Sequence, residues 1–400
     1  MSISILRYSD VGEHTIKTTM ANIAFQSNDE GIISIGVIGT ANIARKNIRG
    51  IKLSKFAKCI AVGSRNLNHA KEYCLQVGLT EKEAFGSYDE VLRNETIQGL
   101  YIPLPTAFHH DMILKCVKHK KHILCEKPCA LDAIELLKML KECYENKIIF
   151  VDGVMFMHNS RLYKLRNEID NELVLGKNKV REVSSAFCFR GDEDFFKNNI
   201  RVKNNCDPLG CLGDLGWYNI RFSLFAYNFE MPEFVQGDII SENENGVPLH
   251  FQGQMVWKDD EKTANGNNMV ARRTATFFCS FLHTEQQWAK LSGEDGMIEI
   301  ADFVIPFNEN EHSFQVNKHV WGDNATKISP QNNLIKSVGI QEVNMWNYFA
   351  QSIIQKNGGT ASSLFFMKVA LKTQIIIDCL LESARNNGVK VQVKDTTNEL

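Results

Sequence analysis

The first third of the chain alternates short apolar runs with longer amphipathic segments. Apolar runs of strand length cover residues 32–38, 59–63, 100–102, 122–125 and 148–151. Helical patterns fill the intervals, at residues 42–52, 68–77, 88–93, 109–118 and 133–145. In the last of these, apolar residues recur close to a 3.6-residue period, as on one buried face of a helix. This alternation predicts an α/β domain built on a doubly wound parallel sheet.

The pattern changes after residue 153, where strand-like runs follow one another with turns and few helices between them. These runs cover residues 251–257, 274–283, 288–291, 297–300 and 313–317, and helical patterns return at 343–355 and 363–386. We therefore expect residues 31–153 to form the first domain, after an N-terminal extension over residues 1–30. Residues 154–400 should form an α+β domain with a large, mostly antiparallel, open-faced sheet.

Composition and charge narrow the range of partners. The chain has 400 residues and a formal net charge of −2, so nucleic acid and anionic membranes are not expected partners. No apolar run approaches the roughly 18 residues of a membrane helix, and no secretory signal is recognisable near the start. The eleven cysteines are scattered and lack the spacing of a zinc site. We expect free thiols in a reducing cytoplasm, and no bound metal.

The turn after the first predicted strand reads GTANIA, from Gly39 to Ala44. It matches much of the dinucleotide fingerprint G-x-G-x-x-G/A, although Ala41 stands in place of the middle glycine. Backbone N–H groups at the start of a helix attract phosphate. The turn therefore predicts a dinucleotide-binding Rossmann domain, and the alternative is a strand–helix turn of some other α/β protein. The expected cofactor contacts here are Gly36, Gly39, Thr40, Ala41, Asn42 and Ile43.

The second predicted strand ends in Gly63-Ser64-Arg65, without the acid that would hold the ribose 2′-hydroxyl of NAD. A guanidinium beside a hydroxyl suits a 2′-phosphate, through charge-assisted hydrogen bonds. Ser64 and Arg65 therefore favour NADP over NAD as the cofactor. The alternative is that Arg65 is only a solvated loop residue.

A lysine follows a later predicted strand, in the stretch HILCEKPCA. Ligands of doubly wound sheets bind at the carboxyl ends of the strands, which is where Lys127 should lie, between Glu126 and Pro128. This position favours a functional lysine. The alternative is a surface lysine at the end of a strand.

The glycine turn, the stretch YIPLPTAFHH and the motif CEKP together resemble the Gfo/Idh/MocA oxidoreductases, over most of the chain from about Gly31 to Gln392. The stretches LGDLGWY and MHNSR are most similar to those of the branch that contains dihydrodiol and NADP-dependent xylose dehydrogenases. The resemblance implies an NAD(P)-dependent dehydrogenase or reductase that acts on a sugar, polyol or cyclic diol. Thr106 departs from the asparagine usual in the family. The implied nicotinamide-side contacts are Pro103, Pro105, Thr106, His109, Glu126 and Lys127.

The resemblance also implies a catalytic group on a helix of the second domain, with Asp214 and Tyr218 four residues apart on one helix face. Tyr218 could instead be a core aromatic. A tyrosine with a pKa of about 10 is a poor base at neutral pH, but a nearby ammonium lowers that value. Lys127 and Tyr218 would then handle the substrate proton, with Asp214 orienting them. The implied substrate contacts are His158, Arg161 and Trp217.

Two further expectations concern the chain as a whole. An NAD(P)-sensing regulatory protein on the same fold is the alternative to an enzyme, but a sensor could lose the lysine and the tyrosine, and both are present.

The second domain should also form a homodimer, because both faces of the run from Thr274 to Leu282 carry aromatic residues. In the family, the open sheet face often makes the subunit contact. The alternative is that the chain's own loops cover this face.

Overall fold

The computed structural model describes residues 31–176, 180–258, 272–321, 326–336 and 339–400. These residues divide into two compact units. Of the described residues, the first unit takes in 31–159, 339–371 and 399–400. The second unit comprises Ser160–Ser337 and Lys372–Asn398. The chain therefore returns to its first unit after residue 337, a stretch that the sequence had assigned wholly to the C-terminal domain.

A six-stranded sheet forms the centre of the first unit, with the strand order β3-β2-β1-β4-β5-β6 and every pair parallel. All six residues of β1 are buried, as expected for a strand covered on both faces. The predicted doubly wound parallel sheet is confirmed. The strands are β1 (Ile33–Ile38), β2 (Ala57–Gly63), β3 (Ala84–Phe85), β4 (Gly99–Ile102), β5 (His122–Cys125) and β6 (Phe150–Asp152).

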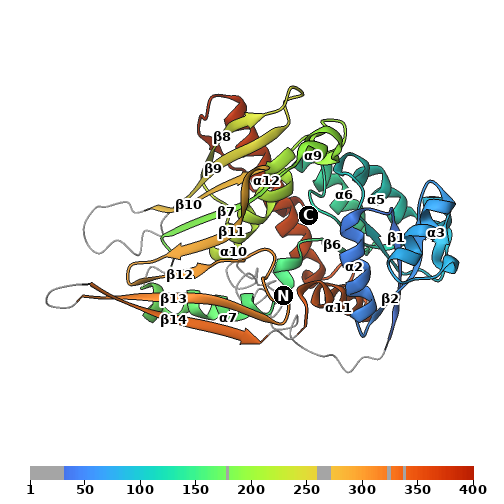
Figure 1. Cartoon of the computed structure of the whole chain (residues 1–400), viewed down its shortest axis with the longest axis horizontal. Coiled ribbons are helices and arrows are strands. Elements are labelled where there is room, and N and C mark those ends of the chain that lie inside the picture. The colour runs from blue at the N-terminus through green and yellow to red at the C-terminus, as the bar shows by residue number, and fades with distance from the viewer. Residues whose placement is uncertain (1–30, 177–179, 259–271, 322–325, 337–338) are drawn as a thin grey trace, which may run out of the picture. The chain divides into compact units, whose positions relative to one another are not determined.

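Helices pack around this sheet (Figure 1). Several begin at side chains that accept a hydrogen bond from the first turn, such as Asp132, whose carboxylate accepts from the N–H of Glu135 at 2.8 Å. Three of the helices have the bounds that the pattern predicted: α4, α5 and α6. The helices are α2 (Asn42–Leu53), α3 (Leu67–Gln76), α4 (Tyr88–Arg93), α5 (His109–Lys118) and α6 (Ala133–Glu145).

Helix α11 (Gln341–Ile354) belongs to the same unit, although in the chain it begins 189 residues after the end of β6 at Asp152. It packs on α2, where Gly50 allows a close approach. A Cβ on Gly50 would stand 3.0 Å from Cδ1 of Trp346. Lys46 of α2 also pairs with Glu342 of α11, at 2.7 Å between Nζ and Oε1. The sequence predicted this helix but not its place against the parallel sheet.

The second unit is built on a nine-stranded sheet, in the order β14-β13-β12-β11-β7-β10-β9-β8-β15. Only β7 and β10 pair in parallel, and the other pairs run antiparallel. The predicted mostly antiparallel sheet is confirmed. The strands are β7 (Glu182–Arg190), β8 (Phe234–Glu242), β9 (Pro248–Lys258), β10 (Arg272–Ser280), β11 (Leu282–Ser292), β12 (Gly296–Ile300), β13 (Glu311–Trp321), β14 (Thr326–Lys336) and β15 (Val391–Gln392).

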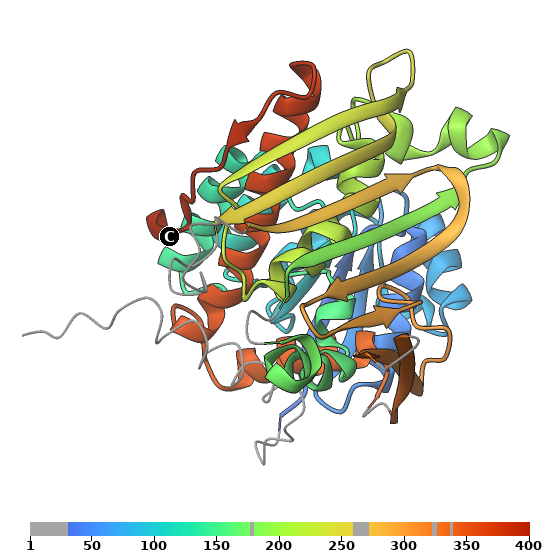
Figure 2. The ribbon, with the colours of Figure 1, turned by 90° about the vertical axis from the view of Figure 1, so that its left-hand side faces the viewer.

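Helix α10 (Trp217–Ala226) covers one face of this sheet, against β7 and β10. Ala275, Phe277 and Cys279 of β10 point to that face and are buried. Thr274, Thr276 and Phe278 alternate with them and are half-buried. Figure 2 looks onto a face of the sheet, and no helix of the described chain crosses in front of β7, β10 and β11. The predicted division of β10 into two faces therefore holds.

Some predicted boundaries in the second unit were wrong. The run 274–283 is two strands, because β10 ends at Ser280 and β11 begins at Leu282. Phe281 makes the corner between them, and its side chain is fully buried. The pattern also missed β7, β8, β14 and β15. The other helices of this unit are α7 (Arg161–Asp170), α8 (Glu172–Leu175), α9 (Glu193–Asn198) and the second half of α12 (Ala361–Arg385). None of the described helices is long and apolar enough to cross a membrane.

Candidate functional site

The glycine turn joins β1 to α2 at the carboxyl edge of the parallel sheet. Gly39 has a φ of +112°, which a residue with a side chain rarely adopts. Its N–H donates to the carbonyl of Gly63 at 2.9 Å, which ties the ends of β1 and β2 together. Ala41 then precedes α2 in an extended conformation and has no side-chain atom that could cap the helix. The N–H groups of Asn42 and Ile43 thus begin a helix whose first turn is suited to phosphate.

Gly36 and Thr40, the other predicted contacts of this turn, lie on either side of it. Gly36 sits inside β1, where a Cβ would stand 2.7 Å from Cγ1 of Val91 and 2.9 Å from Cδ2 of Leu100. This close packing explains the glycine without a cofactor. Thr40 is half-buried within the turn itself, between Gly39 and Ala41.

A tyrosine that the sequence did not single out holds the turn from α3. The hydroxyl of Tyr73 donates to the carbonyl of Ala41 at 3.0 Å. The guanidinium of Arg45 lies over the Tyr73 ring, 5.0 Å from its centre. Burial raises the pKa of Tyr73 to about 12, so its hydroxyl remains a donor at neutral pH. Tyr73 of α3 therefore holds both the glycine turn and the start of α2 in place.

Ser64 and Arg65 follow the second strand, as predicted. The N–H of Ser64 donates to the carbonyl of Phe85 at 3.1 Å, and its Oγ accepts from the N–H of Asn66 at 3.4 Å. Asn66 caps α3 by accepting from the N–H of His69 at 3.2 Å. Arg65 is exposed between these two anchored residues. A fixed hydroxyl followed by an exposed guanidinium fits a phosphate group at the end of β2.

The loop after β4 carries Pro103, Pro105 and Thr106 and ends at His109, the first residue of α5. Thr106 and His109 are buried. The Nε2 atom of His109 lies 2.8 Å from the carbonyl of Leu104, and Nδ1 lies 3.2 Å from the carbonyl of Cys129. The imidazole thus joins the loop after β4 to the loop after β5. The sequence predicted a nicotinamide contact at His109, and the structure gives its ring a role in joining these two loops.

The strand β5 ends directly before Glu126 and Lys127. Glu126 is 8% exposed, and its backbone N–H donates to the carbonyl of Ile102 at 3.1 Å. Its carboxylate accepts the hydroxyl of Tyr101 at 2.6 Å. Lys127 is half-buried, and the Lys127–Pro128 peptide bond is cis. The lysine thus lies at the carboxyl edge of the parallel sheet, as predicted, beside a buried acid with defined partners.

In the second unit, Asp214 lies in a π-helical turn, Leu212–Gly216, that leads directly into α10. The sequence had predicted one regular helix through Asp214 and Tyr218. The carboxylate of Asp214 accepts from Nε of Arg201, 2.9 Å from Oδ2. Arg201 was missed because it lies 13 residues earlier, in an irregular segment around the short helix Ile200–Val202. Single-turn π-helices recur at functional sites, which makes this turn a candidate in its own right.

Tyr218 is the second residue of α10 and is 5% exposed. Its ring makes an edge contact with Phe187 of β7, with the ring centres 5.5 Å apart. Trp217, a predicted substrate contact, is fully buried, and the guanidinium of Arg221 lies 6.0 Å from its ring centre. The catalytic role of Tyr218 and the substrate contact of Trp217 stay predictions.

His158 and Arg161, the other predicted substrate contacts, are interior residues. The ring of His158 is fully buried and stacks on Phe366, with the ring centres 5.0 Å apart. Arg161 belongs to the second unit, where its Nη1 lies 2.5 Å from Oδ1 of Asp302 and 3.1 Å from the carbonyl of Ser313. This ion pair fastens the start of α7 to the segment after β12. Stacking on Phe366 accounts for His158 and the ion pair with Asp302 accounts for Arg161, and their substrate contacts stay predictions.

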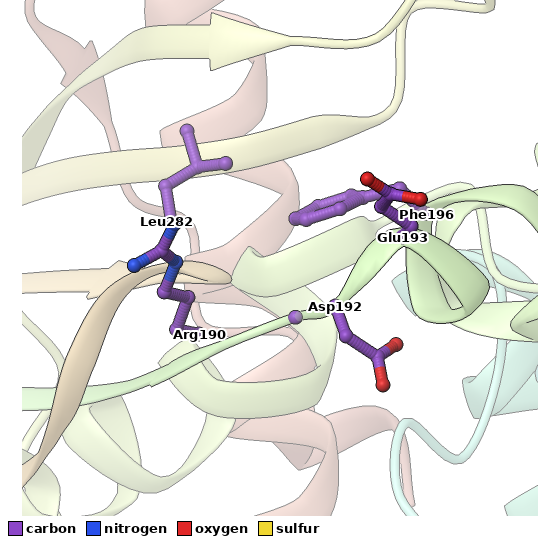
Figure 3. Close-up of a pocket in the computed structure, with 6 residues that line it drawn as sticks. Arg190, Asp192, Glu193, Phe196 and Leu282 are labelled. Atoms are coloured by element: carbon purple, nitrogen blue, oxygen red, sulfur yellow. The ribbon is translucent and has the colours of Figure 1, made fainter.

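A surface hollow of about 600 Å³ lies at the end of β7 in the second unit. Figure 3 shows Arg190 beside Leu282 on one side and Glu193 beside Phe196 on the other. The hollow contains none of the predicted site residues. Its lining is Arg190, Gly191, Asp192, Glu193, Phe196 and Leu282.

Several known proteins are similar to this chain in sequence and in fold. Residues 33–153 match the profile of the Gfo/Idh/MocA family, described as an oxidoreductase family with an NAD-binding Rossmann fold. The match covers the parallel-sheet part of the chain, with the glycine turn and Lys127. Curated proteins of similar sequence include the NADP(+) D-xylose 1-dehydrogenase 2 of Haloferax volcanii, 24% identical over 66% of this chain and 74% of its own length. The human trans-1,2-dihydrobenzene-1,2-diol dehydrogenase is 23% identical over 68% of this chain and 74% of its own length.

A solved structure of similar fold is that of KijD10, a 3-ketoreductase from Actinomadura kijaniata in complex with NADP and TDP-benzene. It covers 88% of this chain and 98% of its own, with a TM-score of 0.72 and 20% identity. At this identity the likeness concerns the fold. The chain spans between 32 and 62% of the length of the first three curated relatives that it matches.

Proposed function

We propose that the protein is an NADP-dependent oxidoreductase that transfers a hydride between nicotinamide and a CH–OH or carbonyl carbon of a sugar, polyol or cyclic diol. The observation that carries this proposal is the position of Lys127. It follows β5 at the carboxyl edge of the parallel sheet, the edge at which the glycine turn begins α2. Ligands of doubly wound sheets bind at this edge. The match of residues 33–153 to the Gfo/Idh/MocA oxidoreductase model supports the same reaction class.

The residues at this edge fit the cofactor. The turn around Gly39 and the N-terminal turn of α2 would hold the pyrophosphate through backbone N–H groups. Ser64 and Arg65 would hold the 2′-phosphate of NADP, and no carboxylate follows β2 to favour the free hydroxyl of NAD. Pro103, Pro105 and Thr106 would flank the nicotinamide, with their loop fixed to the loop after β5 by His109.

Nicotinamide supplies the hydride chemistry when the cofactor is bound. The chain must then move the proton of the reacting hydroxyl, because loss of a hydride from a C–OH carbon has to be coupled to loss of that proton. Lys127, at the end of β5, would donate to the reacting oxygen and stabilise negative charge on it. Tyr218 is the second proton-handling group, and Asp214, held by Arg201, is the acid that orients it. Such acid–base help typically contributes roughly 10²–10⁴ in rate.

The alternative function is a catalytically idle NAD(P)-sensing regulatory protein. Lys127, Tyr218 and Asp214 are all present, and the named relatives are dehydrogenases and reductases. These relatives support a carbohydrate or diol substrate. A screen of sugars and diols with NADP⁺, followed at the NADPH absorbance band, tests the proposal. Formation of NADPH with at least one of them is expected, whereas NADPH binding without turnover across the screen would favour the sensor.

We further propose that the protein is a cytoplasmic homodimer. All eleven cysteines are free thiols, which suits a reducing compartment. On the face of the large sheet that α10 does not cover, Phe278 lies near Trp288 and His250, with ring centres 6.4 and 6.2 Å apart. A second copy of the same face would cover these half-buried aromatic rings.

A further inference from the structure

Four buried side chains of the first unit form a continuous hydrogen-bonded chain that ends at Glu126. The indole Nε1 of Trp346 donates to Oδ1 of Asn47 at 3.1 Å. Nδ2 of Asn47 donates to the hydroxyl of Tyr101 at 2.7 Å, and that hydroxyl donates to Oε1 of Glu126 at 2.6 Å. Nδ2 of Asn47 also lies 3.5 Å from the same carboxylate oxygen. The chain links α11, α2, β4 and the residue after β5, which are far apart in the sequence.

Trp346 sets the direction of every bond in this chain. An indole N–H can only donate, so the oxygen of the Asn47 amide must face it. The amide nitrogen of Asn47 is then left to donate to the oxygen of Tyr101. Because this oxygen accepts from Asn47, its own proton is directed to Glu126. The arrangement therefore delivers a donor to Glu126 and requires the Glu126 oxygen to be an acceptor.

The surroundings of Glu126 make these bonds important. Trp346 and Tyr101 are fully buried, Asn47 is 2% exposed and Glu126 is 8% exposed. A carboxylate removed from water is costly unless donors satisfy it. A Cβ on Gly153 would stand 3.0 Å from Oε1 and 3.1 Å from the carboxyl carbon of Glu126. The carboxylate thus lies directly on the backbone after β6, and a larger side chain there would displace it.

We infer that Tyr101, Asn47 and Trp346 are positioning residues of the proposed cofactor site, and that they act through Glu126. Glu126 is a predicted cofactor contact and is followed directly by Lys127, so a shift of its side chain or backbone disturbs both. The inference rests on the proposed function. It gives α11 a role beyond covering α2, because Trp346 supplies the donor that orders the whole chain.

The test compares two variants, each of which removes the hydroxyl of a buried tyrosine that donates a 2.6 Å hydrogen bond. Tyr101→Phe removes the hydroxyl that donates to Glu126. Tyr227→Phe is the matched control, because Tyr227 is also buried and donates a 2.6 Å hydrogen bond, to the carbonyl of Thr274 in the second unit. The dissociation constant for NADPH is measured by fluorescence titration, and the midpoint of thermal unfolding is measured for each variant. Tyr101→Phe should weaken NADPH binding about tenfold, and Tyr227→Phe less than twofold, for similar losses of thermal stability.

A double substitution shows whether the tyrosine acts through the acid. Glu126→Gln should itself weaken NADPH binding. Adding Tyr101→Phe to it should cause little further loss, because the carboxylate charge that the hydroxyl satisfies has already been removed. Should Tyr101→Phe fail to fold, Trp346→Phe replaces it, with Trp257→Phe as its control. Trp257 is equally buried and donates to the carbonyl of Glu230 at 3.0 Å.

The outcomes separate the inference from the proposed function. If the unmodified protein does not bind NADPH, the proposed function fails and the inference fails with it. If it binds NADPH and the tyrosine variants show equal dissociation constants, the inference alone is overturned. Independent, additive losses for Tyr101→Phe and Glu126→Gln would also overturn it, because they would mean that the tyrosine does not act through the acid.

Discussion

Arg201 and Asp214 form an ion pair in the second unit, with Nε 2.9 Å from Oδ2. The Asp214 side chain is 12% exposed, so its charge is poorly solvated and depends on this partner. The pair changes the interpretation of Asp214. The sequence suggested an acid that orients Tyr218 and Lys127, and the structure shows that the acid is itself held by an arginine from the segment after α9.

Replacement of Arg201 by Met should therefore lower turnover by roughly tenfold or more, because Asp214 loses the guanidinium that fixes its position. The affinity for NADPH should stay within about twofold, since the proposed phosphate contacts belong to the first unit. Steady-state kinetics and NADPH titration check this. Arg181→Met is the control, because Arg181 also forms a partly exposed ion pair, 3.0 Å from Glu294. Equal effects of the two substitutions on turnover would contradict the role given to Arg201.

Replacement of Arg65 by Asp should invert the cofactor preference. The exposed guanidinium would be replaced by a carboxylate that repels the 2′-phosphate of NADP and can accept the ribose hydroxyl of NAD. Titration of both cofactors against both proteins measures the change. Arg93→Asp alters the charge of the same unit by the same amount, at an exposed position of α4, and should leave the preference unchanged. Equal affinity of the unmodified protein for NADP and NAD would end this prediction.

His122 makes the stability of the first unit depend on pH. Its Nδ1 accepts from the N–H of Ile149 at 3.0 Å, and burial lowers its pKa from 6.5 to about 4. Between these two values the unfolded chain binds a proton and the folded protein does not. The free energy of unfolding should therefore fall as the pH drops from about 6.5 to about 4, by about 1–3 kcal/mol after allowance for the partial exposure of the ring.

Urea unfolding across this range, compared with that of His122→Asn, measures the effect. The asparagine amide oxygen can accept the same N–H but does not titrate. The unmodified protein should lose more stability on acidification than the variant does. Parallel pH dependences of the two proteins would show that His122 is not the group responsible.

The proposed dimer depends on the uncovered face of the large sheet. Replacing Trp288 by Asp would place a charge among Phe278, His250 and their symmetry mates, where it would be desolvated without a partner. Sedimentation at micromolar concentration should show a dimer for the unmodified protein and a monomer for this variant. Ile134→Asp, at a 70% exposed position of α6, should remain dimeric. A monomeric mass for the unmodified protein would count decisively against the dimer.

The parallel sheet could be predicted closely because its signals are local. The apolar runs of β1, β2, β4 and β5 are bounded by turns, and α4, α5 and α6 begin and end at the predicted residues, whereas the two-residue strand β3 was missed. The glycine turn and CEKP carry their meaning within a few residues. Each motif could therefore be placed at the carboxyl end of a strand before the structure was known.

The features that the sequence did not reveal depend on contacts between distant segments. Trp346 reaches Asn47 across 299 positions, and no local pattern marks a tryptophan as a hydrogen-bond donor to another helix. Arg201 lies in an irregular segment with no periodicity. The strand β7 was missed because Ser184 and Ser185 interrupt its alternation, although its pairing with β10 and β11 makes it central to the sheet. His158 and Arg161 illustrate the opposite problem, because polar residues near a motif can be interior packing residues.

The most direct test of the account is the turnover of Lys127→Met. The substitution keeps the length and apolar stem of the side chain but removes the ammonium. Turnover with NADP⁺ and the best substrate should fall by roughly 10²-fold or more, while NADPH binding and thermal stability change little. Tyr218→Phe should also lower turnover, and the double variant should lose less than the sum of the two effects. A folded Lys127→Met protein that binds NADPH and turns over at the normal rate would show that Lys127 does not serve the reaction.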